Sequence, residues 1–514
     1  MIKLKLEKTE FVNKLEKFEV VEDGIFVYLY KIAGCYYVYD VVSSEIMKVS
    51  KSLYDLLEAI NIKSKPARID ALCNLSTKIP YEKIVDGITN IENVRKNHSV
   101  FISVPKDFKI VLNRNALEKN IALEGLILEV TYACNFRCSY CSFSGNYQYE
   151  RTFKSANMPT STAIKAVDYF FDNRYENSPE PWISIYGGEP LLQKDLILDV
   201  IKYAQKKFQK VKFNIQTNGY LLDYEFYEKI KGYSVTLSIS IDGPKQIHDR
   251  CRVLINKEGT FDKILSNLEK IANDDEEFIK KRVNIVYTMP SLHNLPEISN
   301  FHYGHPILRN CNTNLNIVND YNLNPNVTVE ELCKVDSIEM KNPPDLNELY
   351  NRYKKALKNN KTKGLHFENK IFGKAIEKSN KKTPLEKTFT ARGLCSIGKK
   401  RLAVDPLGNF RICERSSRMP IIGNLTEGIN WEAINKMEKD YIQKIQPCYE
   451  CWALVFCTIC WAKLYLRDKD IIDIDYKEKY CDEIRQQVAF NLKAFSNLSE
   501  TLPEEISEIL SKIK

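Results

Sequence analysis

The sequence lacks the features that would place the protein outside the cell or in a membrane. Its 15 cysteines in 514 residues are far below the roughly 8–10% that marks a small disulfide-stapled scaffold. The cysteine count is odd, and Met1–Lys8 alternates charged with apolar residues instead of forming an apolar signal segment. No apolar run approaches the roughly 18 residues of a membrane span, because Lys463 ends the longest one, Cys451–Ala462. We therefore expect a protein of the reducing cytoplasm that has no membrane partner.

The sequence also lacks a strong excess of charge of either sign. The chain has 75 lysines and arginines against 67 aspartates and glutamates, a formal net charge of +8. The two signs are interleaved along the chain, which is typical of a solvated surface, so a nucleic-acid partner is not expected. With 44% hydrophobic residues the chain can build large cores, and its length predicts about two to four domains.

Changes of pattern divide the chain into five predicted segments. Residues 1–110 form a small module, 120–320 alternate strands with helices, 321–390 are a Lys-rich helical linker, 391–485 are dense in cysteine, and 486–514 form an amphipathic helical tail. In the first segment the patterns predict three strands followed by three helices. The strands are Phe18–Val21, Ile25–Tyr30 and Tyr36–Asp40, and the helices are Ser43–Ile60, Ala67–Cys73 and Ile79–Asn90. The module has no polar cluster, which favours binding over catalysis.

The second segment has the pattern of an α/β fold. Strands that alternate with helices pair in parallel through right-handed crossovers. Six such units predict a partial TIM-like barrel, with chemistry at the C-terminal ends of the strands. The predicted strands are Leu126–Thr131, Trp182–Tyr186, Val211–Gln216, Val235–Ile241, Val283–Thr288 and Leu315–Val318, and the helices between them include Ser161–Asn173, Leu191–Phe208, Tyr224–Lys231 and Phe261–Ala272.

Three cysteines lie within eight residues, directly after the first of these strands: Cys134, Cys138 and Cys141. Thiolates bind soft metals and iron–sulfur clusters, whereas a structural zinc ion takes four ligands in paired spacings. No fourth cysteine or histidine follows nearby. A four-iron cluster held here would keep one iron open to another ligand, and this asymmetry favours chemistry at the cluster.

The run Cys134-Asn-Phe-Arg-Cys138-Ser-Tyr-Cys141 resembles the cluster loop of radical S-adenosylmethionine (SAM) enzymes. Membership would imply that SAM chelates the open iron and that one electron cleaves it to a 5′-deoxyadenosyl radical, which abstracts hydrogen from a substrate. One strand–helix unit later, Gly187-Gly188-Glu189-Pro190 resembles the family segment that holds the amino group of SAM. Glycine permits close backbone approach to a ligand, and a carboxylate accepts hydrogen bonds.

Two more motifs follow the third and fourth strands. By the same resemblance Ser240 and Arg252 contact SAM, and the implied cofactor-binding set also includes Tyr140, Asn218 and Asp242. The role of His248 stays open between the site and a helix cap. Four motifs in order, all at the C-terminal ends of strands, carry the radical-enzyme hypothesis.

A second group of cysteines lies near the C-terminus. A zinc ribbon would use paired cysteines, but the five residues between Cys451 and Cys457 are too few for the usual ribbon loop. The arrangement resembles the SPASM extension of radical SAM enzymes, which carries two auxiliary four-iron clusters. This chain departs from the usual three residues between the fifth and sixth cysteines, since only two separate Cys457 from Cys460. The seven are Cys395, Cys413, Cys448, Cys451, Cys457, Cys460 and Cys481.

The SPASM resemblance implies how these seven divide. Cys448, Cys451, Cys457 and Cys481 would complete one cluster, and Cys395, Cys413 and Cys460 would serve the other, which makes three [4Fe-4S] clusters in all. Because residues 396–412 contain no cysteine, the second of these would keep an open iron that can bind a substrate thiolate; the alternative is a cluster that only relays electrons. The remaining five cysteines are interpreted as small buried hydrophobes: Cys35, Cys73, Cys251, Cys311 and Cys333.

Glu414 is the candidate general base. It directly follows Cys413, where related sulfatase maturases have an aspartate that acts as a base, and a glutamate can take a proton at a different reach. The alternative is a surface ion pair with Arg415.

These motifs lead to one functional hypothesis. The chain resembles radical SAM maturases that install thioether crosslinks in ribosomally made, cysteine-rich peptides. Its first segment resembles winged-helix-like domains that take a leader peptide as an added strand, the alternative being a stabilising cap. Implied partners are the precursor peptide with its leader and a reductant such as flavodoxin or ferredoxin. Alternatives are formylglycine-type dehydrogenation or a carbon–carbon crosslink and, in another class, a non-catalytic iron–sulfur electron carrier or a zinc-binding protein.

Overall fold

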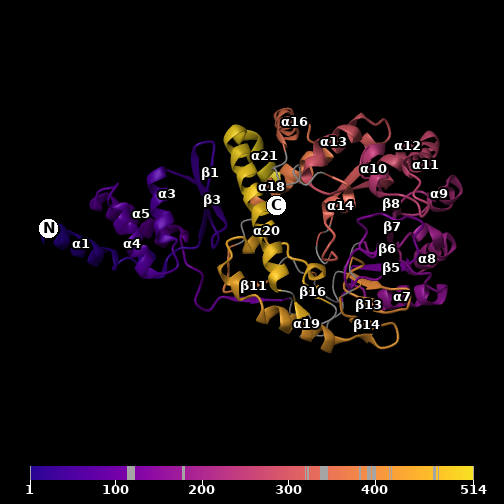
Figure 1. Ribbon diagram of the computed structural model, residues 1–514, viewed down its shortest axis with the longest axis horizontal. Helices are drawn as coiled ribbons and strands as arrows, with labels where there is room; N and C mark the ends of the chain where they lie inside the picture. The colour runs from indigo at the N-terminus through magenta and orange to yellow at the C-terminus, as the bar shows by residue number, and fades with distance from the viewer. Residues whose placement is uncertain are drawn as a thin grey trace.

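The computed structural model describes residues 2–112, 122–175, 180–318, 320, 323–335, 345–380, 384–390, 395, 401–415, 417, 419–466, 471–472 and 474–512. Figure 1 shows the N-terminal module at one end of the molecule and the central sheet with its helices at the other. The C-terminal helices α20 (Ile474–Thr501) and α21 (Pro503–Lys512) lie between them.

The N-terminal module is a three-stranded antiparallel sheet packed on helices. Its strands are β1 (Val27–Ile32), β2 (Cys35–Asp40) and β3 (Glu45–Val49), with β2 in the middle. Helices precede and follow the sheet, so the module is α+β as expected. They are α1 (Ile2–Leu15), α2 (Glu19–Asp23), α3 (Lys51–Ile60), α4 (Lys65–Leu75) and α5 (Tyr81–His98).

Two predictions for this module are wrong. The run Phe18–Val21 is not a strand, because Glu19–Asp23 forms α2 and buries Val20 and Val21 against the helices. The pattern over Ser43–Ile60 is not one helix either, since Glu45–Val49 pairs with β2. The helix begins only at Lys51, where the Ser50 side chain caps it by accepting from the Leu53 N–H at 3.2 Å.

The central sheet confirms the partial barrel of six strand–helix units. Its six parallel strands lie side by side in chain order, and α-helices follow them as crossovers. The strands are β5 (Gly125–Thr131), β6 (Trp182–Gly187), β7 (Lys212–Thr217), β8 (Val235–Ser240), β9 (Val283–Met289) and β10 (Asn312–Ile317). The helices are α7 (Thr160–Asp172), α8 (Lys194–Lys207), α9 (Tyr224–Ile230), α10 (Lys245–Cys251), α11 (Phe261–Asp274), α12 (Glu276–Arg282) and α13 (Leu295–Gly304), with short 3-10 turns η1 (Pro190–Gln193), η2 (Leu292–Asn294) and η3 (Leu308–Asn310).

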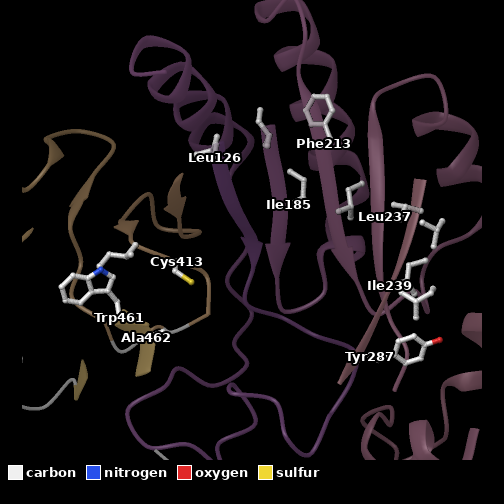
Figure 2. Close-up of a cluster of buried hydrophobic side chains, with 14 of the residues drawn as sticks. Leu126, Ile185, Phe213, Leu237, Ile239, Tyr287, Cys413, Trp461 and Ala462 are labelled. Carbon is white, nitrogen blue, oxygen red and sulfur yellow. The ribbon is translucent and has the colours of Figure 1, made fainter. Parts of the chain in front are cut away.

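The barrel core continues into the cysteine-dense segment. Strand side chains such as Leu126, Ile185 and Phe213 are buried between sheet and helices, and Figure 2 shows them on neighbouring strands. Cys413 and Trp461 lie beside the sheet on C-terminal segments and belong to the same buried cluster. The C-terminal segment is therefore packed on the barrel as part of one core.

Residues after β10 first form helices and then return to the sheet. The helices are α14 (Val329–Cys333), α16 (Asn347–Lys358), α17 (His366–Glu368), the π-helical turn η4 (Asn369–Gly373) and α18 (Lys374–Asn380). Strand β12 (Arg401–Val404) pairs in parallel with β5, and β13 (Phe410–Arg411) is antiparallel to β12. Strand β11 (Thr388–Thr390) pairs with β4 (Lys109–Val111). The cysteine-dense segment is thus hydrogen-bonded to the first barrel strand.

The rest of this segment has little regular structure apart from one helix. It contains two short strand pairs, β14 (Gly423–Asn424) with β15 (Gly428–Ile429) and β16 (Tyr465–Leu466) with β17 (Ile471–Ile472). Between these pairs in sequence lie helix α19 (Trp431–Gln443) and the 3-10 turns η5 (Gln446–Glu450), η6 (Leu454–Phe456) and η7 (Trp461–Lys463). Helix α20 begins at Ile474, so Cys481 lies inside a helix. In the described part of the chain, no helix combines the length and the apolar character needed to cross a membrane.

Candidate active site

A cavity of about 1280 Å³ lies between the barrel and the C-terminal segment. Residues that directly follow β5, β6 and β7 line it, so it opens at the C-terminal ends of the strands, as predicted for the site. It brings together twelve of the residues singled out from the sequence: Cys134, Cys138, Tyr140, Cys141, Gly187, Gly188, Glu189, Asn218, Ser240, Arg252, Glu414 and Cys460.

The first cysteine loop follows β5 and turns its three thiols toward one another. The Cys141 N–H donates to the Cys138 carbonyl at 3.1 Å, and the Phe136 N–H donates to Cys134 Sγ at 3.4 Å. Burial raises the pKa of Cys134 to about 12. Burial also raises the pKa of Cys138, and the charges of Cys141 and Cys134 add to the shift. These thiols ionise together only when a cation compensates them, which fits a metal cluster as the partner.

Gly187 and Gly188 lie against the backbone of the cysteine loop. A Cβ at Gly188 would lie 2.1 Å from the Ala133 carbonyl oxygen, and one at Gly187, whose φ is +144°, would lie 2.4 Å from that of Thr131. The Gly188 N–H donates to Thr131 O at 2.8 Å. Glycine is therefore required here because the backbone of Gly187 and Gly188 approaches the cysteine loop of the same chain. This contact fixes the distance between the glycine segment and the cysteines.

Glu189 is buried and ties β6 to β7. Its Oε1 accepts from the Thr217 hydroxyl at 2.5 Å and from the Leu191 N–H at 3.0 Å, while Oε2 accepts from the Asn218 N–H at 2.8 Å. Three of the roughly four acceptor positions of a carboxylate are thereby filled, which leaves about one for a ligand amino group. Pro190 begins η1 and does not line the cavity, in contrast to Glu189.

An ion pair stands beside the cysteine loop. Arg252 Nε donates to Asp242 Oδ1 at 2.9 Å, the Tyr140 hydroxyl donates to Asp242 Oδ2, and Arg252 Nη1 lies 3.8 Å from Cys138 Sγ. Burial opposes the charge of Arg252, but Asp242, Tyr140 and Cys138 raise its pKa well above the usual value. Asp242 lies behind the cavity wall and Arg252 forms part of it. The pair holds a positive charge next to a candidate cluster thiolate.

His248 has a structural position. It is fully buried inside α10, where its Nδ1 accepts from the Asp242 N–H at 3.3 Å and its Nε2 lies 3.0 Å from Thr260 Oγ1. Burial and the charge of Arg252 lower its pKa well below the usual value. The neutral ring therefore supports the turn that carries Asp242, and it does not line the cavity.

Four of the seven C-terminal cysteines influence one another's charge. Burial raises the pKa of Cys457 to about 12, and Cys481, Cys448 and Cys451 add to the shift, so these four thiols lie near one another. Two cations of α20 face this group: Lys477 Nζ lies 3.6 Å from Cys448 Sγ, and Arg485 hydrogen-bonds to Cys451.

Arginines surround the other group. Arg401 Nη2 lies 3.3 Å from Cys395 Sγ, and the Arg415 N–H donates to Cys413 Sγ at 3.2 Å. The Arg415 side chain is largely exposed, and the charges of Glu414, Cys413 and Cys460 raise its pKa. Cys460 lines the cavity, so this group reaches the same space as the first cysteine loop.

In the described ranges, no three His, Cys, Asp or Glu side chains are placed to hold a single metal ion. A structural zinc site needs four ligands around one ion. A four-iron cluster is bound through a different iron by each cysteine, which lets its ligands stand farther apart. All three cysteine groups fit that larger partner.

Glu414 points into a buried part of the cavity. Its Oε2 is buried without a hydrogen-bond partner among the described residues, and Arg415 Nε lies 3.8 Å from Oε1. Burial raises the pKa of Tyr186 and the charge of Glu414 adds to the shift, so the two side chains lie in the same part of the cavity. Of the five isolated cysteines, Cys251, Cys311 and Cys333 are buried as expected, whereas Cys35 and Cys73 are half-buried.

The sequence reasoning missed several further residues that line the cavity. Tyr186, Arg415, Asp320, Lys463 and Glu483 line it together with Lys479 and Tyr480. Lys479 Nζ lies 2.7 Å from Asp320 Oδ2, so the pair joins α20 to the segment after β10. Their only sequence signal was proximity to motifs: Tyr186 precedes Gly187, Lys463 follows Cys460, and the α20 residues flank Cys481.

Comparisons with known proteins agree with this geometry. Residues 128–289 match the family model of the radical SAM superfamily. Two curated relatives are an uncharacterized protein of Methanocaldococcus jannaschii, 32% identical over 187 residues, and a cysteine-type anaerobic sulfatase-maturating enzyme of Clostridium novyi, 32% identical over 157 residues. The matches cover 35% and 30% of this chain and 57% and 41% of those proteins, so the chain spans about half the length of these relatives.

The fold resembles a solved structure of native anSMEcpe with bound AdoMet and Cp18Cys peptide. The TM-score is 0.53 with 16% sequence identity, and the match covers 74% of this chain and all of the other. The central barrel of this protein is thus a radical SAM domain, with the fold that its cysteine loop and strand-end motifs implied.

Proposed function

We propose that this chain, a radical SAM enzyme by its central domain, modifies a ribosomally made precursor peptide by forming a thioether between a cysteine sulfur and a carbon. One observation supports this most. One cavity is lined by Cys134, Cys138 and Cys141 from the barrel, which we call the first wall, and by Cys460 and Glu414 from the C-terminal segment, which we call the second wall. A radical generated on the first wall and a substrate thiolate held on the second would meet within this space.

The first wall fits SAM and one four-iron cluster. The three cysteines of the loop would hold the cluster, and Glu189, Asn218, Ser240 and Arg252 would position SAM. When bound, these groups supply a 5′-deoxyadenosyl radical that removes a hydrogen atom from the substrate. The chain itself orients the ligand and keeps a positive charge beside Cys138 through Arg252.

The second wall fits an auxiliary cluster with one free iron. Cys395, Cys413 and Cys460 provide three thiolates, one fewer than a fully ligated cluster uses. Forming the carbon–sulfur bond removes one hydrogen atom from carbon and a proton and an electron from the thiol. Glu414 is the proposed acceptor of the proton, and its buried oxygen without a partner among the described residues supports this role. The electron needs an acceptor, and the two proposed auxiliary clusters are candidates for that role.

The N-terminal module is proposed to bind the leader of the precursor. Strands β1 and β3 are the edges of its sheet, and β1 side chains contact α20. The outer edge of β3 pairs with no other strand in the described part of the chain, so it can accept an added strand. A one-electron donor such as flavodoxin or ferredoxin and a reducing compartment such as the cytoplasm complete the proposal.

A second candidate function is formylglycine formation on a cysteine or serine. The Clostridium novyi relative is a sulfatase-maturating enzyme, and Glu414 occupies the position next to Cys413 where a base serves that reaction. This reaction converts a cysteine side chain to an aldehyde and releases its sulfur. A thioether keeps the sulfur and removes two hydrogens from the peptide.

The test uses the full chain reconstituted with iron and sulfide under anaerobic conditions. We expect about three four-iron clusters per chain and release of 5′-deoxyadenosine after reduction with SAM. A small cysteine-rich peptide encoded beside the gene is then incubated and analysed by mass spectrometry. Loss of two hydrogens together with one free thiol supports thioether formation, whereas an aldehyde that reacts with hydrazide supports the second candidate. Bound zinc without sulfide would contradict both.

A further inference from the structure

The N-terminal sheet has two faces of different character. On β1 and β2, Val27, Leu29 and Val38 point to the helices of the module and belong to its own core. The alternating residues Tyr30, Tyr37 and Tyr39 belong to the main core of the molecule instead. Because side chains alternate along a strand, the tyrosines form one continuous face. Figure 1 shows this sheet beside α20.

This tyrosine face contacts the loop that carries Cys448, Cys451 and Cys457. Tyr28 stacks on Trp452 with ring centroids 3.7 Å apart and planes 9° from parallel. Tyr39 packs on Phe456 at 5.2 Å. On the chain that leaves the module, Phe108 meets Tyr449 edge-on at 5.7 Å, and the Ile110 N–H donates to the Tyr449 hydroxyl at 3.3 Å.

Each aromatic residue of the loop is the sequence neighbour of a cysteine. Tyr449 follows Cys448, Trp452 follows Cys451 and Phe456 precedes Cys457. Between Gln446 and Lys463 the chain forms only short 3-10 turns. Such turns hold a loop weakly by themselves, so the position of these cysteines depends on what their aromatic neighbours pack against.

The fourth cysteine of this group is linked to the same module. Cys481 lies on α20, and that helix contacts the sheet through Ser496 Oγ, 2.8 Å from the Tyr30 hydroxyl, and through Glu500, 2.9 Å from Lys48 Nζ. The module thus touches both segments that supply the four thiols.

We propose that the N-terminal module positions the auxiliary cluster assigned to Cys448, Cys451, Cys457 and Cys481, with Tyr28, Tyr39 and Phe108 as positioning residues for the cysteine loop. The module that is proposed to bind the leader peptide would therefore also keep the cysteine ligands of this cluster in position. This inference rests on the proposed function, because it requires that Cys448, Cys451, Cys457 and Cys481 bind a cluster. It adds that retention of this cluster depends on residues more than 300 positions away in sequence.

The experiment compares full-length chains reconstituted under anaerobic conditions. Tyr28→Ala removes the stack on Trp452, and Tyr28→Phe keeps the ring. The matched control is Tyr36→Ala, because Tyr36 lies on the opposite face of the same sheet and packs on Tyr54 at 5.1 Å inside the module. Iron and sulfide per chain, the electron paramagnetic resonance spectrum of the reduced clusters and the rate of iron release to a bipyridyl chelator are measured for each.

We expect Tyr28→Ala to release about four irons per chain roughly tenfold faster than the wild type and to change the resonance of one cluster only. Tyr28→Phe and Tyr36→Ala should match the wild type. Hydrogen exchange over 51–98 shows whether the module stays folded in each variant. If Tyr28→Ala is too unstable, Trp452→Ala and Trp452→Phe give the same comparison from the loop side.

Two outcomes separate this inference from the proposed function. A wild-type chain that holds one cluster would overturn the proposal of auxiliary clusters. A wild-type chain with three clusters, together with a Tyr28→Ala variant of the same iron content, release rate and spectrum, would overturn the positioning role alone. Equal effects of Tyr28→Ala and Tyr36→Ala would also overturn it, because general loss of module stability would then explain both.

Discussion

Arg252 and Asp242 form a buried ion pair whose arginine also reaches the sulfur of Cys138. The Nε–Oδ1 distance is 2.9 Å, and the two side chains are only 10% and 3% exposed. Removing one partner of such a pair leaves an uncompensated charge, which costs about 3–5 kcal/mol. We expect Arg252→Met to lose this amount of local stability and to bind SAM weakly.

The control for this prediction lies on the neighbouring helix. Lys245 and Asp262 also form an ion pair, but their side chains are 51% and 72% exposed. Exposed pairs contribute about 0–1 kcal/mol, so Lys245→Met should change little. Hydrogen exchange of the β8 amides measures the stability of both variants, and isothermal titration measures SAM binding. Equal losses in the two variants would contradict the role given to the buried pair.

Gly188 tests the contact between the glycine segment and the cysteine loop. The Cβ of Gly188→Ala would lie 2.1 Å from the Ala133 carbonyl oxygen, so either the loop or β6 must shift. Overpacking of this kind costs about 1–3 kcal/mol. We expect the variant to lose the iron of the first cluster, about four atoms per chain, and to release no 5′-deoxyadenosine.

Gly232→Ala is the matched control, because a Cβ there meets nothing within 4 Å. It should keep its iron and its activity. A Gly188→Ala chain with full iron content and normal SAM cleavage would show that the loop tolerates the added methyl group.

The sequence predicted the barrel well because its strand residues alternate with amphipathic helices in a regular order. Strand β5 is buried at every residue from Gly125 to Thr131, and in β7 buried residues alternate with less buried ones. The N-terminal module was harder. Over Ser43–Ile60, helix α3 follows strand β3 with no turn residues or change of polarity between them. The capping residue Ser50 was the one local sign that a helix begins there. Short apolar runs such as Phe18–Val21 fit a strand or a helix equally.

Motif residues were predictable, but their partners were not. Cys134, Gly188 and Glu189 stand out by spacing alone. That Gly188 faces Ala133, and that Glu189 already accepts three hydrogen bonds, depends on how two loops meet in space. The stack of Tyr28 on Trp452 joins residues 424 positions apart. Local pattern carries no information on such pairs without an alignment of related chains.

His302 predicts how stability depends on pH. It is buried among Tyr287, Tyr303, His305 and His366, and burial lowers its pKa to about 3, with the charges of His366 and His305 adding to the shift. The unfolded chain binds this proton below about pH 6.5, and the folded chain binds it only near pH 3. Between these values the unfolded state holds more protons, so stability falls as the pH is lowered, by about 1.4 kcal/mol per pH unit.

This prediction is tested by the slope of stability against pH, and the stability at any single pH does not test it. Thermal unfolding of the chain between pH 5.5 and 7.5, followed by circular dichroism, should show a smaller pH dependence for His302→Gln than for the wild type. His98 is exposed at the end of α5, and His98→Gln should leave the slope unchanged. An unchanged slope in His302→Gln would mean that other groups, such as the buried His248, account for the acid sensitivity.

A substitution at Glu414 should distinguish radical generation from the later modification of the peptide. Glu414 lines the cavity from the C-terminal segment, and its side chain is 12% exposed. A proton acceptor in this place acts after SAM cleavage, so Glu414→Gln should release 5′-deoxyadenosine at the wild-type rate. Modified peptide should fall by about 100-fold, the lower bound for loss of a general base. The ratio of 5′-deoxyadenosine to modified peptide, measured by chromatography and mass spectrometry, is the readout.

Two further variants make the Glu414 result specific. Glu414→Asp keeps a carboxylate at a shorter reach and should restore part of the product. Glu427→Gln changes an exposed carboxylate of the β14–β15 turn that hydrogen-bonds to Asn424 at 2.8 Å, and it should behave as the wild type. If Glu414→Gln lowers 5′-deoxyadenosine and product by the same factor, Glu414 holds the fold of the Cys413 turn and does not accept the proton. A Glu414→Gln chain with normal product would leave the base to another residue of the cavity, with Tyr186, whose pKa the charge of Glu414 raises, as the next to change.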